Sequence, residues 1–444
     1  MSLNNIIAEN VFLPLGDILS GNKVSKYLKF LLKSQYWTQE QIENYQNLRL
    51  RKLIEYAYEN VPFYKNIFIK NKLSVDDIMT KDDLVKLPIL TKKIIREAGS
   101  EIQSIDYPKR WTISSGSSGS TGEPLFFLLS KEAYSLNLAA NLRGWYWMGF
   151  RLGDKYIKIS QNLRNKKLKN IQDFVSRNKY LSINPMVDSN FKYILDTIEK
   201  YRPKVIRSYP DPLFFLAEYK AKHKDYNYIP ASITTTGNTL FPETRKFIEN
   251  TFGCAVFDAY SCEGTPNVFE CPTHEFYHIT DEYAITEVLD ENNNVINDGV
   301  GRLISTDLWN FAQPFIRYDT QDMVEISSTP CKCGKKLKRI KRILGRDNDI
   351  IIAPNGRKFI VHNFTVFFQR DDKHLKRSIE SFQVRRKGNI ISILLIVNEN
   401  YDNSVKEYIR NYWKNEMNMD IIVKEVDQIP LTKSGKRRFI INED

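Results

Sequence analysis

The spacing of apolar positions changes twice along the 444-residue chain. Between residues 39 and 61, the apolar side chains of Leu48, Leu53, Ile54 and Tyr58 recur near helical spacing, and Pro62 ends the run. A proline-marked turn and a second helix are predicted within 86–102. The first 110 residues are therefore expected to be mainly helical.

From about residue 111, short apolar runs alternate with longer amphipathic stretches. Strand-like runs occupy 204–210, 231–237, 254–261 and 301–308. Helix-like stretches occupy 211–223 and 241–253. Strands that alternate with helices are typical of βαβ units, so this region predicts an α/β sandwich with a largely parallel sheet.

Near residue 345 the pattern changes again. Four segments favour strand, strand, helix and strand in turn: 381–388, 389–400, 404–417 and 420–426. This order predicts a small α+β unit that could fold alone. We expect a large N-terminal domain over 1–345, with a helical lead-in over 1–110, and a small C-terminal domain over 346–444.

Composition limits the class of protein without choosing a function. Hydrophobic residues make up 42% and charged residues 27%, which is typical of a globular chain. No secretory signal and no run long enough to span a membrane is found, so a cytoplasmic protein is expected. The formal charge of +12 would attract nucleotide, nucleic acid or anionic lipid phosphates alike.

The stretch ISSGSSGSTGEPLFF, residues 113–127, carries no apolar side chain from Ser114 to Glu123. Its glycines and hydroxyl side chains suit an anion-binding nest for phosphate, a plain hairpin connection or a flexible linker. The strand-like run 124–130 follows at once, and the loop lies inside the α/β region, which argues against a linker between domains.

Two further segments carry candidate chemistry. In STDLWNFAQPFIRYDTQD, residues 305–322, Arg317 at the end of a strand could meet a phosphate, and Asp322 could bind two ribose hydroxyls. A structural Arg–Asp pair is the alternative and is favoured by this segment alone. In PLTKSGKRR, residues 430–438, Lys436 follows a Ser-Gly turn, with a solvated basic tail as the alternative.

Cysteine and histidine side chains gather in two segments between residues 271 and 333. They are Cys271, His274, His278, Cys331 and Cys333. Thiolate and imidazole are preferred zinc ligands, whereas reduced thiols without metal are the alternative. The cysteines alone do not decide between them.

Taken in order, these segments resemble the adenylate-forming superfamily of acyl-CoA synthetases, peptide-synthetase adenylation domains and luciferases. The resemblance rests on SSGSTGEP at 117–124, YSCEG at 260–264, the Arg317 to Asp322 segment, GRDND at 345–349 and PLTKSGKRR. ENVPFYKNIF and KLPILTKKIIRE are similar to the phenylacetate-CoA ligase branch, which includes proteins associated with capsular polysaccharide synthesis.

The resemblance implies ATP-dependent activation of a small carboxylic acid as its acyl-adenylate, with release of pyrophosphate. The acyl group would then pass to a thiol, coenzyme A first, or alternatively to an amine or a sugar. The implied site residues are Ser117, Ser118, Gly119, Ser120, Thr121 and Gly122 for the ATP phosphates, Glu263 for Mg²⁺, Asp322 for ribose, Tyr260, Arg317 and Arg346 near the nucleotide, Lys436 for the reacting carboxylate, and Asp349 as hinge.

The chain departs from the family pattern at a few positions. Gln321 replaces the glycine before Asp322, the segment around Glu263 is one residue shorter, and Asn238 stands where many relatives carry an acid. These departures affect details of nucleotide contact and remove no catalytic group.

Some relatives in the branch carry a similar cysteine and histidine set, which favours a structural zinc site. The implied ligands are Cys271, His278, Cys331 and Cys333, with His274 as the alternative imidazole. Such a site would fix the segment leading to Arg317. Two rival interpretations are a nucleic-acid-binding protein, based on the basic run 332–346, and a catalytically inactive scaffold. The acid, the acceptor and the oligomeric state stay open.

Overall fold

The computed structural model describes most of the chain as two compact units. The described residues are 2–116, 125–160, 177–183, 187–223, 225–237, 239–262, 267–346, 351–354, 357–359, 363–364, 367–368, 374–375, 378–429 and 438–443. The first unit comprises Met1–Thr320 and Glu325–Arg342, and the second comprises Gln321–Val324 and Ile343–Asp444. Each unit is described by itself.

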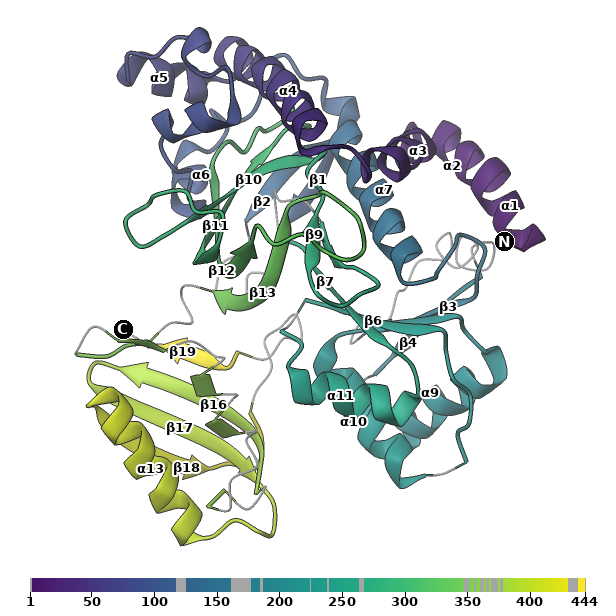
Figure 1. The fold of residues 1–444 in the computed structure, drawn as a ribbon, viewed down its shortest axis with the longest axis vertical. Coiled ribbons are helices and arrows are strands. Elements are labelled where there is room, and N and C mark those ends of the chain that lie inside the picture. The colour runs from purple at the N-terminus through teal and green to yellow at the C-terminus, as the bar shows by residue number, and fades with distance from the viewer. Residues whose placement is uncertain are drawn as a thin grey trace. The chain divides into compact units, whose positions relative to one another are not determined.

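Helices dominate the start of the first unit, as predicted (Figure 1). They are α1 (Leu3–Ile7), η1 (Ala8–Phe12), α2 (Leu13–Ser20), α3 (Val24–Ser34), α4 (Gln39–Asn60), α5 (Pro62–Lys70), η2 (Val75–Asp77), η3 (Lys81–Lys86) and α6 (Lys92–Ala98). Thr38 and Gln41 form a capping box at the start of α4. Pro62 both follows α4 and begins α5, because its fixed φ suits a first helical turn and that position needs no N–H donor.

The sheet region follows. Its elements are η4 (Lys109–Trp111), β1 (Thr112–Gly116), β2 (Phe126–Ser130), α7 (Lys131–Trp147), β3 (Tyr156–Ser160), β4 (Asn178–Ser182), α9 (Asp188–Tyr201), β5 (Val205–Ser208), α10 (Pro210–Lys222), β6 (Ser232–Thr236), α11 (Pro242–Phe252), β7 (Val256–Tyr260), β8 (Val268–Glu270), β9 (Tyr277–Ile279), β10 (Ala284–Leu289), β11 (Gly299–Asp307), β12 (Tyr318–Ser327) and β13 (Arg339–Arg346). Most of the strands join one mixed sheet.

Within the described residues, that sheet has eleven strands in the order β10-β11-β12-β13-β9-β8-β7-β6-β5-β3-β4. The β3 to β7 strands run parallel, and α9, α10 and α11 connect β4 to β5, β5 to β6 and β6 to β7. β7, β8, β9 and β13 pair antiparallel in succession, and so do β10 and β11. The prediction of a largely parallel sheet is therefore wrong for this half, because connections too short for a crossover helix return the chain as hairpins.

The second unit has a four-stranded sheet in the order β18-β17-β16-β19, within the part of the chain described. Its elements are β14 (Ile351–Ile352), β15 (Lys358–Phe359), β16 (Ile379–Lys387), β17 (Ile390–Val397), α13 (Asn403–Met417), β18 (Asp420–Glu425) and β19 (Ile440–Asn442). The buried face of α13 carries Val405, Ile409, Trp413 and Met417 at four-residue spacing. The predicted order of strand, strand, helix and strand is confirmed.

The α/β fold class, with its helical start and its C-terminal sheet unit, is thus confirmed. No helix among the described residues is long and apolar enough to cross a bilayer.

Candidate active site

The Gly/Ser/Thr loop connects two paired strands. β1 and β2 are antiparallel from the Thr112–Ser130 pair to the Gly116–Phe126 pair. Residues 117–124 join them, so the predicted phosphate-binding residues Ser117 to Gly122 lie outside the described residues. Because both flanking strands belong to one hairpin of the first unit, the stretch is not a linker between domains.

The segment 305–322 provides a platform for this hairpin. The Leu128 N–H donates to Gln313 Oε1 at 2.9 Å, and the Ser130 N–H donates to Asn310 Oδ1 at 2.9 Å. Asn310 Nδ2 returns a hydrogen bond to the Leu128 carbonyl at 2.8 Å. Asn310 and Gln313 are almost fully buried, so their side-chain amides form hydrogen bonds with β2 and not with solvent. Sequence reasoning missed both; their signal was two polar amides within an apolar run.

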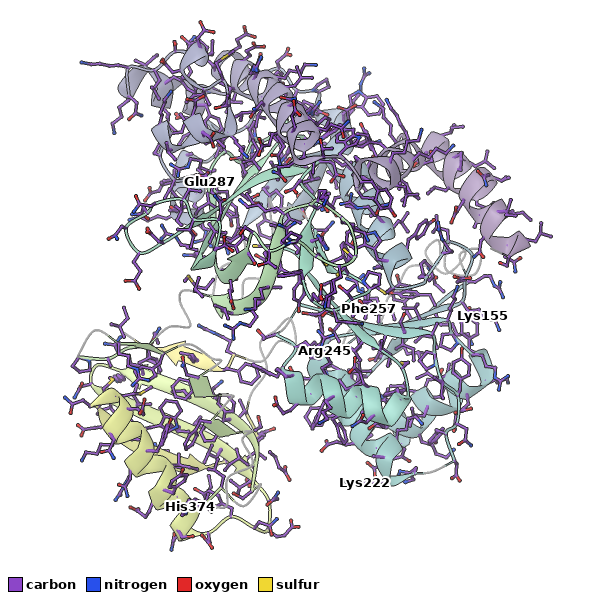
Figure 2. The ribbon with its side chains drawn as sticks, viewed as in Figure 1. Lys155, Lys222, Arg245, Phe257, Glu287 and His374 are labelled. Atoms are coloured by element: carbon purple, nitrogen blue, oxygen red, sulfur yellow. The ribbon has the colours of Figure 1, made fainter. Side chains whose placement is uncertain are left out.

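Arg317 lies directly before β12, and not at the end of a strand as predicted. Its φ of 54° is left-handed, and its N–H donates to Thr306 Oγ1 at 2.9 Å. The guanidinium is bidentate on Glu287 of β10, with Nε–Oε2 at 3.1 Å and Nη2–Oε1 at 2.9 Å (Figure 2 labels Glu287). Nη1 donates to the Leu87 carbonyl at 2.7 Å. The described structure therefore gives Arg317 a structural carboxylate partner, Glu287.

The same junction ties the helical start of the unit to β12. The Leu90 N–H donates to the Arg317 carbonyl at 2.9 Å, and the Asp319 N–H donates to the Leu90 carbonyl at 2.8 Å. The segment that ends at Asp322 thus begins from a position fixed by both backbone and side-chain bonds.

Gln321 adopts a backbone conformation that suits glycine, the residue of the family pattern at this position. Its φ is 62°, in the left-handed region that glycine occupies without steric cost. Asp322 follows within β12 and is buried, with 6% of its surface exposed. The unusual backbone at Gln321 therefore immediately precedes the predicted ribose ligand.

A buried polar network is centred on Asp258 of β7, two residues before the predicted nucleotide residue Tyr260, which is the last residue of that strand. Asp258 on the same strand accepts hydrogen bonds from the Thr235 hydroxyl at 2.6 Å and the Tyr277 hydroxyl at 3.0 Å. Burial raises the pKa of Asp258 to about 7. Ligands in open α/β sheets bind beyond the carboxyl ends of parallel strands, which is where β6 and β7 end.

Glu270 connects this network to the neighbouring helix. It forms an ion pair with Arg245 of α11 at 2.9 Å and accepts the Asp258 N–H at 2.9 Å (Figure 2 labels Arg245). Asp258 and Glu270 were not singled out by the sequence, since isolated acids in strand-like segments carry no motif.

The remaining predicted residues lie mostly outside the described part of the chain. Tyr260 pairs with Val268, so Glu263 belongs to the short connection between β7 and β8. Glu263, Asp349 and Lys436 all lie outside the described residues. Arg346 is the last residue of β13, and only its backbone is described. These assignments stay predictions.

The structure brings together four of the five predicted metal-ligating side chains. One ligand atom each from Cys271, His278, Cys331 and Cys333 lies within 4.8 Å of the others. Cys271 Sγ is 3.5 Å from Cys331 Sγ, and Cys333 Sγ is 3.1 Å from His278 Nε2. Three thiols and one imidazole, which converge from two segments of the chain, match the donor set of a tetrahedral zinc site.

His274 lies apart from this cluster. Its Nδ1 is 3.5 Å from Glu270 Oε2, and its ring packs on Phe257 with centroids 4.5 Å apart. The structure thus places His278, and not the alternative His274, beside the thiols.

Local turns shape both halves of the cluster. Cys271 follows β8 and His278 lies in β9, while Cys331 and Cys333 belong to the connection from β12 to β13. The Gly334 N–H donates to the Cys331 carbonyl at 3.1 Å, and the φ of 80° at Gly334 suits glycine. The cluster thus joins the β8–β9 hairpin to the segment after β12. Arg317 lies before β12, so the prediction that the cluster fixes the segment leading to Arg317 is wrong.

The thiols of the cluster differ in acidity. Burial raises the pKa of Cys271, but hydrogen bonds with His278, Thr273 and Cys331 outweigh it and bring the value to about 5. Burial raises the pKa of Cys333 to about 12. A metal ion would favour the thiolate form of every cysteine in the set.

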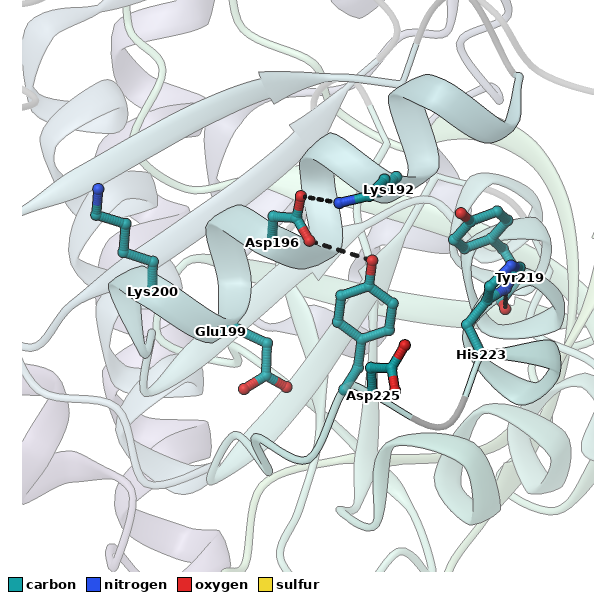
Figure 3. Close-up of a pocket in the computed structure, with 8 residues that line it drawn as sticks. Lys192, Asp196, Glu199, Lys200, Tyr219, His223 and Asp225 are labelled. Atoms are coloured by element: carbon teal, nitrogen blue, oxygen red, sulfur yellow. Dashed lines mark hydrogen bonds and ion pairs between the residues drawn. The ribbon is translucent and has the colours of Figure 1, made fainter.

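A surface cavity of about 590 Å³ lies between α9 and α10, far from this chemistry in the chain (Figure 3). Lys192 and Tyr226 both contact Asp196 there, at 2.7 and 3.2 Å. Glu199 and Tyr226 precede β5 and β6 in the chain, so the cavity lies near the amino ends of these parallel strands. Tyr260 lies at the carboxyl end of the neighbouring strand β7.

Comparison with known proteins agrees with this geometry. The CapK C-terminal domain family matches residues 351–443. The chain is 28% identical to Protein CapK of Staphylococcus aureus, with 89% of this chain and 88% of that protein covered. It is 25% identical to a phenylacetate-coenzyme A ligase of Pseudomonas putida, with 79% and 80% covered.

Solved structures share the fold over most of the chain. A 2-hydroxyisobutyryl-CoA ligase in its postadenylation state matches with a TM-score of 0.73, at 16% identity, and 93% of this chain and 92% of that chain are covered. The amide bond synthetase McbA of Marinactinospora thermotolerans matches with a TM-score of 0.55, at 15% identity, over 75% and 70%. The relatives and the shared fold confirm the resemblance of the ordered motifs to the adenylate-forming superfamily, in its phenylacetate-CoA ligase-like branch.

Proposed function

We propose that the protein is an AMP-forming ligase that joins a carboxylic acid to coenzyme A in two steps. A carboxylate oxygen attacks the α-phosphorus of ATP, and pyrophosphate leaves. The coenzyme A thiol then attacks the acyl carbon, and AMP leaves. The observation that carries the proposal is the full ordered set of adenylating motifs, in a chain that covers 80% of a phenylacetate-coenzyme A ligase.

The residues of this chain would divide the work between binding and charge stabilisation. The loop from Ser117 to Gly122 would donate hydrogen bonds to the β- and γ-phosphates, and Asp322 would accept bonds from the ribose. Glu263 would bind Mg²⁺, which neutralises the triphosphate. Lys436 would stabilise negative charge on the carboxylate and the α-phosphate as the new bond forms.

Asp349 would act as a hinge between the proposed domains 1–345 and 346–444. Rotation there would withdraw Lys436 after the first step and admit the acyl acceptor. Tyr260 and Arg346 would contact the nucleotide, and Arg317 would act beside it. We also propose that the protein works in the cytoplasm, where ATP and coenzyme A are available.

We propose that Cys271, His278, Cys331 and Cys333 hold a structural zinc ion. The support is the convergence of their ligand atoms within 4.8 Å. His278 would use Nε2, the atom that lies beside Cys333 Sγ. The ion would join the β8–β9 hairpin to the β12–β13 connection and take no part in either chemical step.

An amine is the second candidate acceptor. The fold shared with an amide bond synthetase supports this candidate. Attack by an amine nitrogen on the same acyl-adenylate would give an amide and AMP. The two acceptors differ only in the second step, so product analysis separates them.

Pyrophosphate release with ATP and a panel of aryl acids, fatty acids and amino acids tests the proposal. Turnover with one acid is expected, and Lys436→Ala is expected to abolish it, whereas Lys424→Ala on exposed β18 should leave it intact. Mass spectrometry of the products then distinguishes an acyl-CoA from an amide. Absence of pyrophosphate with every acid, together with tight nucleic acid binding in moderate salt, would overturn the ligase proposal.

A further inference from the structure

Residues 3–20 form a helical rod that makes hydrogen bonds to the rest of the first unit through polar side chains. Asn5 is buried and donates from Nδ2 to the Leu152 carbonyl at 2.9 Å. Glu9 accepts a hydrogen bond from the Tyr146 hydroxyl at 2.6 Å. Asp17 accepts the N–H groups of the first two residues of α3, at 2.9 and 2.7 Å. The inward positions 5, 9 and 17 differ by multiples of four residues, and Leu13 between them packs against the core of the first unit. This face of the rod is therefore fixed by three polar side chains and one apolar side chain.

The opposite face of the rod is apolar and exposed. We call it the apolar stripe, and its residues are Leu3, Ile6, Val11, Phe12, Leu15, Ile18 and Leu19. Their exposed fractions range from 46% to 88%. Positions 11, 15, 18 and 19 lie on one helical face. The π-helical turn η1, Ala8–Phe12, accommodates one extra residue, which keeps Ile6 aligned with Val11.

The outer side of the rod differs from that of an ordinary surface helix. Such a helix turns its apolar face toward the core and its charges toward water. Here an amide, two carboxylates and Leu13 hold the inner side, and seven large apolar side chains face outward. A contiguous exposed apolar surface usually marks a site of association.

Charge indicates the kind of partner. The two acidic residues among residues 1–35 are Glu9 and Asp17, which are occupied on the inward face. The adjacent helix α3 exposes Lys26, Lys29 and Lys33, whereas Lys23 directly before it forms an ion pair with Glu132 at 2.7 Å. Lys26 and Ile18 line the same cavity of about 640 Å³, so stripe and lysines adjoin. A second copy related by a twofold axis would bring lysines toward lysines, whereas an anionic surface would attract them.

We propose that the apolar stripe and the α3 lysines form a peripheral binding surface for an anionic lipid membrane. The rod would lie in the interface, with its apolar side chains among the acyl chains and the lysines near the lipid phosphates. Figure 1 shows α2 next to α3 and α1 farther along the rod, at the margin of the first unit. The residues of the stripe are exposed there.

Co-sedimentation of the full chain with vesicles tests this surface. Vesicles of phosphatidylcholine with phosphatidylglycerol are expected to bind the protein, and pure phosphatidylcholine vesicles are expected to bind it at least about tenfold more weakly. Ile18→Gln with Leu19→Gln should weaken binding by about tenfold or more, since these side chains are 77% and 88% exposed. Ile69→Gln with Ile105→Gln is the matched control, at 63% and 76% exposure, and should change nothing.

A second pair of variants tests the charge. Lys26→Gln with Lys29→Gln should remove most of the preference for anionic vesicles, whereas Lys52→Gln with Lys65→Gln on other exposed helical positions should not. Failure of the wild-type chain to bind anionic vesicles, or equal binding by the stripe variant, would overturn the proposal. If the wild-type chain is instead a dimer that Ile18→Gln with Leu19→Gln makes monomeric, with no vesicle binding, the stripe is an interface between copies. Pyrophosphate release is expected to be unaffected in every variant.

Discussion

The buried pair between Arg317 and Glu287 offers the sharpest test of how the candidate site is held. The two side chains are only 6% and 7% exposed, and the carboxylate accepts two parallel hydrogen bonds from the guanidinium. Replacing Glu287 with Ala leaves the Arg317 charge buried with only backbone carbonyls as partners. Removing one partner of a buried ion pair costs about 3–5 kcal/mol, so we expect a loss of that size in the free energy of unfolding.

The measurement is a double-mutant cycle by urea unfolding with Glu287→Ala, Arg317→Met and the double variant. Since each single variant leaves a buried group without its partner, the double variant should lose clearly less than the sum of the two. Asp196→Ala removes an exposed pair with Lys192 and serves as control, with an expected change within about 0.5 kcal/mol. A coupling energy near zero would refute the view that this pair fixes the start of β12.

The same variants separate positioning from direct contact with the nucleotide. The guanidinium of Arg317 is occupied by Glu287 and two carbonyls, so Arg317 is expected to act by holding the segment that carries Asp322. Glu287→Gln should then raise the KM for ATP about as much as Arg317→Gln does. If only Arg317→Gln impairs turnover, Arg317 contacts the substrate directly and the positioning role is wrong.

Three further outcomes follow from single contacts. Cys331→Ser should lower bound zinc, measured by elemental analysis, from about one equivalent to less than about a tenth. Cys254→Ser, which lies away from the cluster, should leave the zinc content unchanged. A zinc-free wild-type protein would contradict the metal proposal. Burial raises the pKa of Asp258 to about 7. Between about pH 4 and pH 7 the folded state therefore keeps a proton on Asp258 that the unfolded state has released, so the free energy of unfolding falls as pH rises through this range. Asp258→Asn should flatten that fall and raise the melting temperature at pH 8; an unchanged pH profile would contradict it. Asn310→Ala should lower the free energy of unfolding by about 1–3 kcal/mol, because the buried Ser130 N–H loses its acceptor. It should also raise the KM for ATP; an unchanged KM would show that the β1–β2 hairpin does not contribute to ATP binding.

Much of the fold followed from local patterns. Helical spacing predicted α4, and β/α alternation predicted β5, α10, β6, α11 and β7, because each pattern is set by which face of one element is buried. The antiparallel half of the sheet did not follow, since strands with similar apolar content pair in either direction and the length of the connection decides between them. The polarity of the rod formed by α1 and α2 was also hidden, because its apolar residues have helical spacing whichever face is buried.

The sequence by itself determined the identity and order of the chemistry-bearing motifs, from the loop at 117–124 to Lys436, since these depend on residue type and spacing along the chain. Only the tertiary structure decided which groups meet. It paired Arg317 with Glu287, thirty positions away, placed His278 and not His274 beside the thiols, and anchored β2 on Asn310. These contacts join segments that are far apart in the sequence. Whether a polar side chain forms its hydrogen bonds with a neighbouring residue or with water depends on how the surrounding surfaces pack together.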